Sequence, residues 1–200
     1  MEFDLDGADQ PLAYKLLASL VTPRPIALVT TLSDDGVINA APFSFFNVLG
    51  SRPPIVGFCP GDREPGVPKD TAINLRQSQE FVVNLVDESI AQGMNQCAAE
   101  LPFGQSELSS AGFTTLPSME IAVPRIAESA VHLECREWGT LQIGQNRLVI
   151  GLVLRLHLRD QLWDPASKRI RVSDFHPVGR MHGADGYCYT RDQFQMARPD

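Results

Sequence analysis

Two long stretches in the second half of the chain alternate between apolar and polar residues with a period of two. In the second of them, every other residue from Leu152 to Leu158 is a leucine. This period is that of a β-strand, whose successive side chains point to opposite faces. Val131–Ile143 and Arg147–Arg159 are therefore predicted to pair as long antiparallel strands around a turn at Gly144-Gln145-Asn146.

The rest of the chain also favours a mainly β fold. Further strands are predicted at Pro25–Thr31, Val37–Val48, Pro54–Cys59 and Glu80–Val86. Short helices are predicted at Ala13–Leu20, Ala72–Gln77, Asp87–Leu101 and Ser106–Ala111, and an irregular tail from Gln161. About six strands at hairpin spacing indicate an antiparallel barrel or sandwich with a few flanking helices. We expect one domain over residues 1–200, with a core at about 14–159 and a C-terminal extension at 160–200.

Charge and composition exclude several kinds of partner. Lys and Arg number 17 against 24 Asp and Glu, which gives a formal net charge of −7 without a basic cluster. This balance argues against nucleic acid or an anionic membrane and favours a small ligand or another protein. The N-terminal MEFDLDGADQ lacks a signal-peptide pattern, and no apolar run approaches the ~20 residues of a membrane span. We expect a cytoplasmic protein.

The cysteines and histidines give no sign of a metal site. The four cysteines are widely separated without a C-x-x-C pair and are expected to be reduced thiols, mostly buried. His132 and Glu134 lie two apart, a common spacing on a strand, so we expect no metal. No side-chain acid, base or nucleophile stands out either, and no catalytic residue is assigned.

The predicted strand Val37–Val48 contains an unusual segment, Asn39-Ala40-Ala41-Pro42. Proline cannot donate a ladder hydrogen bond, so Pro42 implies an edge, a bulge or a bend. The small alanines allow a flat heteroaromatic ligand to lie against the backbone. The alternative, which this segment leaves open, is that the alanines relieve crowding in a barrel and Pro42 marks its corner.

A second segment, Lys69-Asp70-Thr71, precedes a predicted helix. A helix N-terminus offers free N–H groups and a positive dipole end to a phosphate, to which Lys69 adds a cation and Thr71 a hydroxyl. Asp70 is expected to cap the helix and to hold its two neighbours in place. Together, the two segments suggest a ligand with a flat ring at one end and a phosphate at the other.

The motifs, taken in order, resemble a known family. The run TPRPIALVTT, NAAPFSFFNV, KDT-x-x-N and EFVVNL is similar to the flavin reductase-like proteins, a group of FMN-binding split β-barrels that includes flavoredoxins. The resemblance covers about Tyr14 to Arg159, and HPVGRMHGADGY resembles the closing segment of these proteins. It implies a six-stranded antiparallel split barrel that binds FMN non-covalently, in a homodimer with sites near the interface.

The resemblance also implies which residues contact the cofactor. The implied flavin contacts lie on two strands, and the implied phosphate contacts lie at the helix start: Thr30, Thr31, Asn39, Ala40, Ala41, Phe43 and Ser44 for the flavin, and Lys69, Asp70 and Thr71 for the phosphate. His182 and Tyr187 are candidates for the nicotinamide or substrate side, against the alternative of an ordinary loop histidine and a packing tyrosine.

Three further residues are left with alternatives. Arg24 either reaches a phosphate or forms a surface ion pair. Asn74 either matters as part of the KDT-x-x-N motif or is only an exposed helix residue. Cys59 either approaches the ring or is a small buried hydrophobe.

The predicted activity is that of a flavoenzyme, in which NAD(P)H delivers hydride to N5 of FMN and the electrons pass to free flavin or another acceptor. One alternative is a flavoredoxin-like electron carrier that serves a protein partner. Another is a split-barrel protein that has lost its flavin. A pyridoxamine-phosphate oxidase relative is less favoured, since more arginines would be expected around its phosphate.

Overall fold

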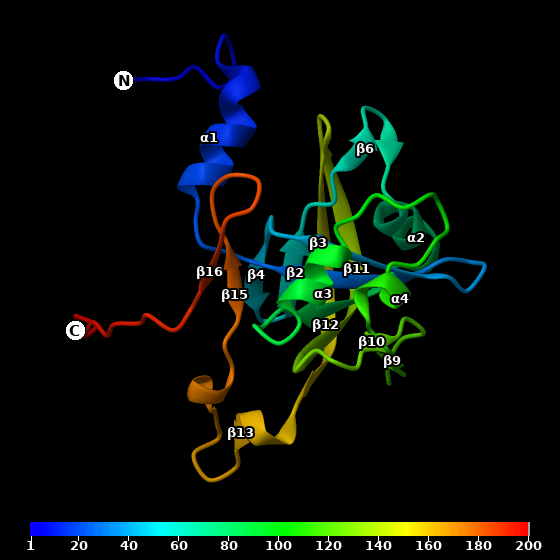
Figure 1. Cartoon of the computed structure of the whole chain (residues 1–200), viewed down its shortest axis with the longest axis vertical. Coiled ribbons are helices and arrows are strands. Elements are labelled where there is room, and N and C mark those ends of the chain that lie inside the picture. The colour runs from blue at the N-terminus through cyan, green and yellow to red at the C-terminus, as the bar shows by residue number, and fades with distance from the viewer. Residues whose placement is uncertain (200) are drawn as a thin grey trace.

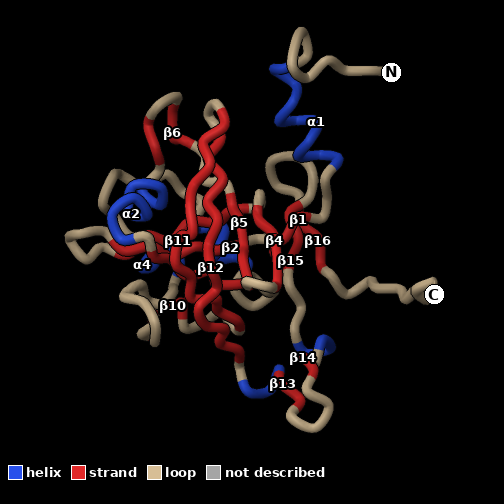
Figure 2. The backbone as a smooth tube through the Cα atoms, turned by 180° about the vertical axis from the view of Figure 1, so that it is seen from behind, coloured by secondary structure: helices blue, strands red, loops and turns tan. Residues whose placement is uncertain are grey.

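A single antiparallel sheet of seven strands forms the centre of the molecule (Figures 1 and 2). The computed structural model describes residues 1–199. The strand order is β3-β2-β8-β11-β12-β5-β4. Their bounds, in that order, are Ile38–Phe43, Ala27–Leu32, Glu80–Leu85, Val131–Ile143, Asn146–Leu158, Pro54–Phe58 and Phe46–Ser51. The long β11–β12 hairpin predicted from the alternating residues is confirmed, and it crosses the middle of this sheet.

The two outermost strands of this sheet, β3 and β4, follow each other directly in the chain. Only Ser44 and Phe45 connect them. The sheet must therefore curl round until its first and last strands meet at one corner, although no ladder joins them in the described chain. The result is a barrel that is split between β3 and β4.

The interior of the curled sheet is a packed apolar core. Its centre is a row of three aromatic rings, with centroid separations of 5.1 Å between Phe43 and Phe58 and 5.3 Å between Phe58 and Phe81. Leu75 of α2 (Asp70–Ser78) closes this core from one end. Such edge-tilted pairs stabilise the core beyond the area they bury.

The outer face of the sheet is covered by two short helices, α3 (Ala91–Gln96) and α4 (Leu108–Ala111), which lie in front of it in Figure 1. Leu28 and Ala40 from the sheet pack there against Met94 and Leu108. Strands β2 and β3 are thus packed on both faces.

The remaining elements flank the barrel. Helix α1 (Ala13–Leu20) stands to one side, beside a small sheet made by the C-terminal hairpin (Figure 1). This sheet has the order β1-β15-β16. The short strands outside the main sheet are Arg24–Pro25 (β1), Asp62–Glu64 (β6), Val67–Pro68 (β7), Thr115–Leu116 (β9), Arg125–Ile126 (β10), Trp163–Asp164 (β13), Arg169–Ile170 (β14), Val178–Arg180 (β15) and Tyr187–Tyr189 (β16).

Three predicted elements differ from the structure. The strand expected at 37–48 breaks at Ser44 and Phe45 into β3 and β4, which gives seven strands in place of six. The helix expected over Asp87–Leu101 is confined to α3, because the Asp87 carboxylate accepts hydrogen bonds from Ser89 and holds residues 87–90 in a turn. The tail from Gln161 is less irregular than expected, since it contains four short strands.

The helices within residues 1–199 do not meet the requirements of a membrane span. None of them is both long enough and apolar enough to cross a bilayer.

Gly151 on β12 provides a test of the interior packing. A Cβ atom there would lie 2.3 Å from Cζ of the buried Phe81 ring. We expect Gly151→Ala to cost ~1–3 kcal/mol of unfolding free energy through overpacking. In the control Gly139→Ala on β11, the added Cβ meets nothing within 4 Å. Urea denaturation should therefore show a loss only for Gly151→Ala, and equal midpoints for both variants would contradict this packing.

Candidate functional site

The predicted ligand segment lies at the split of the barrel. Strand β3 is an edge strand whose Pro42 stands opposite Leu28 of β2, so the missing N–H interrupts no pairing on the outer side. The chain bends two residues later, at Ser44 and Phe45. Two of the three predicted explanations for Pro42, an edge and a bend, therefore apply together.

Strand alternation sorts the residues of β3 into two sets. Asn39, Ala41 and Phe43 share the face toward the barrel interior, and Ala41 packs against the edge of that core. Ala40 is fully buried in the outer core beneath α3 and α4. The first set faces the helix-side cavity described next, whereas Ala40 lines neither cavity.

Two of the cavities that border β3 share part of their walls. The first, which we call the helix-side cavity, has a volume of about 100 Å³. Six of the predicted contacts line it together with Arg63 and Glu107: Asn39, Ala41, Phe43, Lys69, Asp70 and Thr71. The second, the strand-side cavity, has a volume of about 320 Å³ and lies between α1, the β3–β4 corner and the β11–β12 turn. Pro42, Phe43 and Lys69 belong to both walls.

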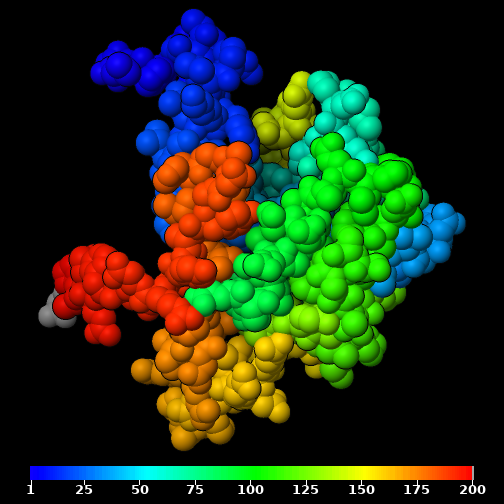
Figure 3. All heavy atoms as spheres, viewed as in Figure 1, coloured from blue at the N-terminus to red at the C-terminus, as the bar shows by residue number. Residues whose placement is uncertain are grey.

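The surface view agrees with this arrangement. Figure 3 shows a hollow between the blue N-terminal helix and the cyan and green segments, with the orange C-terminal loop along its border. Predicted residues that line the strand-side cavity are Phe43, Ser44, Lys69 and Cys59. Burial raises the pKa of the Cys59 thiol.

A buried polar network fixes the start of α2 against the β2–β3 hairpin. Asn39 Nδ2 donates to Thr71 Oγ1 at 2.9 Å and to Thr31 Oγ1 at 3.5 Å. Asn74 Nδ2 donates to the same Thr31 oxygen at 3.0 Å. All four residues are buried, so the predicted alternative that Asn74 is only an exposed helix residue is wrong. Thr31 lines neither cavity, but it holds Asn39, which lines the helix-side cavity, through this network.

The helix start itself differs from the prediction. Lys69 occupies the N-cap position with extended backbone angles, and no side chain caps α2. Asp70 is instead the first helical residue, and its carboxylate pairs with Arg63 at 3.0 Å. The expected cap by Asp70 is therefore wrong, because Arg63 holds that carboxylate. The first-turn N–H groups have no side-chain cap, and Lys69 forms no ion pair with any residue from 1 to 199.

Glu107 is a member of this site that sequence analysis missed. Its buried carboxylate accepts a hydrogen bond from the backbone N–H of Ala40 at 2.9 Å. Burial raises the pKa of Glu107, and burial together with the Glu107 charge raises the pKa of Cys97 to about 12. The contact joins residues 67 positions apart, and no local sequence signal announces it.

Thr30, Ala40 and Arg24 have roles apart from the cavities. Thr30 is fully buried and donates its hydroxyl proton to the Pro124 carbonyl at 2.8 Å. The backbone N–H of Ala40 donates to the Glu107 carboxylate. Arg24 is buried and donates to the carbonyls of Ala18 and Val21 and, at 3.4 Å, to Ser44 Oγ. Its role matches neither predicted alternative, since it ties α1 to the β3–β4 corner.

The two candidate substrate residues lie outside both cavity walls. Tyr187 on β16 donates its hydroxyl to Asn95 Oδ1 at 3.3 Å, in a separate cavity beside α3. His182 is exposed in the preceding loop. The carbonyl of its neighbour Met181 accepts a hydrogen bond from Arg24, so this loop lies near the β3–β4 corner.

Comparison with known proteins shows the family of the chain. A family model described as "Flavin reductase like domain" matches residues 19–173. The chain belongs to the flavin reductase-like family. This membership was predicted from the motifs and is confirmed, and it places the chain among flavin oxidoreductases.

Individual relatives agree over almost the whole chain. The crystal structure of nitrilotriacetate monooxygenase component B from Bacillus cereus is similar at 32% identity and a TM-score of 0.91, covering 98% of each chain. The structure of Pseudomonas fluorescens 2-nitrobenzoate 2-nitroreductase NbaA is similar at 36% identity and a TM-score of 0.89, covering 100% of this chain and 96% of that one. A Deinococcus radiodurans protein is 41% identical over 98% of this chain and 88% of its own length. The predicted mainly β, antiparallel split barrel is confirmed.

The raised pKa of Glu107 leads to a test of the site's stability. The pKa of Glu107 in the folded state is above the ordinary 4.5, so ionisation of this carboxyl group favours the unfolded chain. Its contribution to the free energy of unfolding therefore falls as the pH rises from the unfolded-state pKa through the folded-state pKa. Glu107→Gln keeps an oxygen for the Ala40 N–H but cannot ionise. In urea denaturation, we expect the free energy of unfolding of Glu107→Gln minus that of the parent to be larger at about pH 7 than at about pH 4.

Glu107→Ala is the matched control. It leaves the Ala40 N–H without an acceptor, and we expect a loss of ~1–3 kcal/mol at both pH values. A Glu107→Gln variant that is less stable than the parent by the same amount at both pH values would contradict the assignment.

Proposed function

We propose that this protein binds FMN non-covalently at the barrel split and acts as an NAD(P)H-dependent flavin reductase. The observation that carries the proposal is the position of Lys69, which belongs to the walls of both cavities. A cation and an uncapped helix start thus lie beside a flat wall made by Ala41 and Phe43. A ligand with a ring and a phosphate matches this combination.

The residues present fit such a cofactor in chemistry and in size. The strand-side cavity, at about 320 Å³, falls within the roughly 300–1,000 Å³ typical of small-molecule sites, and the helix-side cavity of about 100 Å³ adjoins it at Pro42, Phe43 and Lys69. Lys69 and the first-turn N–H groups of α2 would hold the phosphate. Arg63 neutralises Asp70, so the nearby carboxylate does not repel that phosphate.

The ring would lie against the other part of the wall. Asn39, Ala41, Phe43 and Ser44 would contact it, and the Asn39–Thr71–Thr31 network would keep the wall rigid. A bound flavin supplies the redox chemistry, by taking a hydride from a reduced nicotinamide and giving electrons to an acceptor. The chain's own task is to bind and orient, which agrees with the lack of an assigned catalytic residue.

The final acceptor separates two candidate functions. Free flavin as acceptor makes the protein a reductase, and one similar structure is component B of a monooxygenase. The alternative is a flavoredoxin-like carrier that passes electrons to a protein partner. Rapid oxidation of NADH or NADPH by the purified protein with added FMN supports the reductase, whereas flavin binding without this oxidation supports the carrier.

We also propose a homodimer. Helix α1 buries only Ala18 and exposes Tyr14, Leu17 and Leu20, and Val48 on the edge strand β4 is exposed as well. An apolar helix face beside an open sheet edge is a surface that a second copy can cover. Light scattering at micromolar concentration should give twice the chain mass of 22.0 kDa, and a mass of one chain would contradict the proposal.

The phosphate assignment can be tested with a pair of lysine variants. Charge-assisted hydrogen bonds contribute ~1.5–3 kcal/mol each, so we expect tighter binding of FMN than of riboflavin by fluorescence quenching. Lys69→Gln should weaken FMN binding at least about tenfold and leave riboflavin unchanged. The control Lys168→Gln changes an exposed lysine far along the chain and should affect neither ligand. Equal affinities of the parent protein for FMN and riboflavin would contradict the assignment of a phosphate site at Lys69.

The ring position can be tested with a pair of alanine variants. Ala41 lines the helix-side cavity, so Ala41→Val should abolish the yellow colour and NAD(P)H oxidation while the thermal midpoint changes little. Ala40 has no exposed surface, so Ala40→Val should cost ~1–3 kcal/mol by overpacking. Full flavin occupancy in Ala41→Val would show that the ring lies elsewhere.

A further inference from the structure

Another cavity lies at the opposite end of β12. It has a volume of about 720 Å³ and shares no lining residue with the helix-side or the strand-side cavity. Arg147, near the start of β12, lines the strand-side cavity, and Leu156, nine residues later, lines this one. At ~3.3 Å per residue the two ends are about 30 Å apart. We call it the β12 cavity.

One wall of the β12 cavity carries a buried acceptor that the described chain does not satisfy. His132 Nε2 lies 2.8 Å from the Ile126 carbonyl oxygen, so Nε2 holds the proton and donates it. Nδ1 is buried and has no hydrogen-bond partner among residues 1–199. Burial lowers the pKa of His132 to about 4, so the ring is neutral at physiological pH and Nδ1 is an acceptor. An unmet buried acceptor is costly, which points to a ligand that brings a donor.

Two cations line the same cavity. Arg125 donates through Nε and Nη2 to the Pro117 carbonyl, and Arg159 donates through Nη2 to the Glu128 carbonyl. Neither guanidinium forms an ion pair within the described chain. Two other polar groups of the lining are His157, whose Nε2 is hydrogen-bonded to the buried Glu134, and the Asp160 carboxylate. Two guanidinium groups without an ion pair among the described residues, against the one carboxylate of Asp160, favour the binding of a ligand with one small anionic group.

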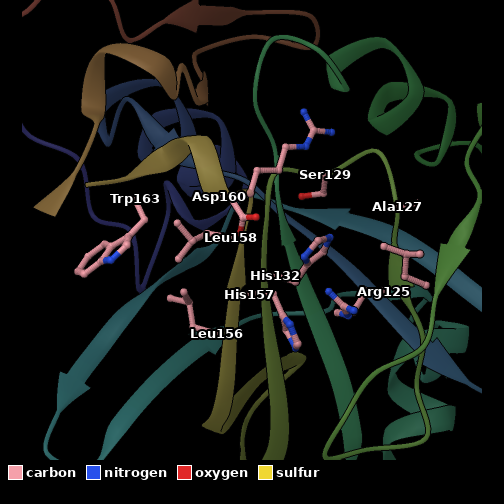
Figure 4. A pocket seen from close by; sticks show the side chains of 11 residues that line it. Arg125, Ala127, Ser129, His132, Leu156, His157, Leu158, Asp160 and Trp163 are labelled. Carbon is pink, nitrogen blue, oxygen red and sulfur yellow. The ribbon is translucent and has the colours of Figure 1, made fainter. Parts of the chain in front are cut away.

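The remaining lining is apolar and aromatic. Leu156 and Trp163 are 53% and 40% exposed and offer apolar surface to a ligand in the cavity. Figure 4 shows Trp163, Leu156 and Leu158 on one side of the two imidazoles and Arg125 on the other. A flat ring can lie against the first group while an anion reaches the second.

We propose that the β12 cavity is a binding site for a small aromatic carboxylic acid that also carries a hydroxyl or amino group. The carboxylate pairs with the free arginine nitrogens, the ring packs on Trp163 and the two leucines, and the hydroxyl or amino hydrogen is donated to His132 Nδ1. A second copy of this chain fits less well, since an apolar surface would cover the leucines but leave Nδ1 unmet. The distance of about 30 Å from the strand-side cavity makes this a binding role separate from the redox site.

The site can be probed through Trp163, because the chain has only one other tryptophan. Trp138 is exposed on β11 and can be replaced by Phe, which leaves Trp163 as the reporter. In this background 4-hydroxybenzoate should change the fluorescence saturably. Benzoate, which lacks the donor, and phenol, which lacks the anion, should bind at least about tenfold more weakly, as expected for the loss of one charge-assisted or buried hydrogen bond.

Two variants assign the contacts. His132→Phe should reduce the affinity for 4-hydroxybenzoate to that for benzoate and leave benzoate unchanged. Arg125→Gln should weaken the binding of 4-hydroxybenzoate and of benzoate and leave that of phenol unchanged, since phenol lacks the anion. The matched control is Arg155→Gln, an exposed arginine on β12 that is paired with Glu120 and does not line the cavity. If His132→Phe fails to fold, the comparison of Arg125→Gln with Arg155→Gln still decides.

Several outcomes would overturn the proposal. They are the absence of saturable binding, equal affinity for the three probes, and equal effects of Arg125→Gln and Arg155→Gln. A Trp163 signal that depends on protein concentration but not on the probes would assign the cavity to a second copy and would also overturn it. Calorimetry with FMN added in excess should give the same affinity for 4-hydroxybenzoate, so this test is independent of the flavin site.

Discussion

The connection between β3 and β4 constrains the rest of the structure. Because only Ser44 and Phe45 separate the first and last strands of the seven-stranded sheet, the sheet must curl until these strands meet. Pro42 removes a donor at the outer edge of β3, and the bend directs β4 away toward β5. The barrel is therefore closed only by the covalent connection at this corner, which the helix-side and strand-side cavities border.

The groups around this corner hold it in one shape. Arg24 ties Ser44 to α1 and to the C-terminal loop, Glu107 binds the free N–H of Ala40, and Asn39 binds Thr71 at the start of α2. Each contact links segments that are distant in sequence, and each is buried or half-buried, so it is stronger than the same contact in water. An uncapped helix start, a cation and a flat apolar wall are thereby kept in a fixed relation. If FMN binds here as proposed, these groups would need no rearrangement to receive it.

Local patterns in the sequence predicted the elements that depend on local physics. The period of two in residues 131–159 and the punctuation after Leu20 gave the right hairpin and the right helix, α1. Alternation also separated Ala40 from Ala41 correctly, since only Ala41 lines a cavity. The motif order was sufficient to recognise the family, because several weak signals in a fixed order are specific together.

Long-range pairing could not be predicted in the same way. Asp70 has the chemistry of a cap, but Arg63 takes its carboxylate through a contact that the sequence does not show. Asn74 seemed exposed because nothing near it in sequence indicates Thr31, 43 residues earlier. Glu107 follows a loop without periodicity, and its partner Ala40 contributes only a backbone group. Such contacts arise from the curl of the sheet, which short segments do not encode.

The central claim is that β3 and the start of α2 form one binding wall. Amide hydrogen exchange with and without FMN measures this most directly, because the first-turn N–H groups of a helix lack internal acceptors and exchange readily unless a ligand covers them. The account predicts slower exchange in residues 39–44 and 69–71 with FMN, slower exchange only in 39–44 with riboflavin, and no change in residues 156–163. Protection that omits both segments, or that is identical for the two flavins, would contradict it.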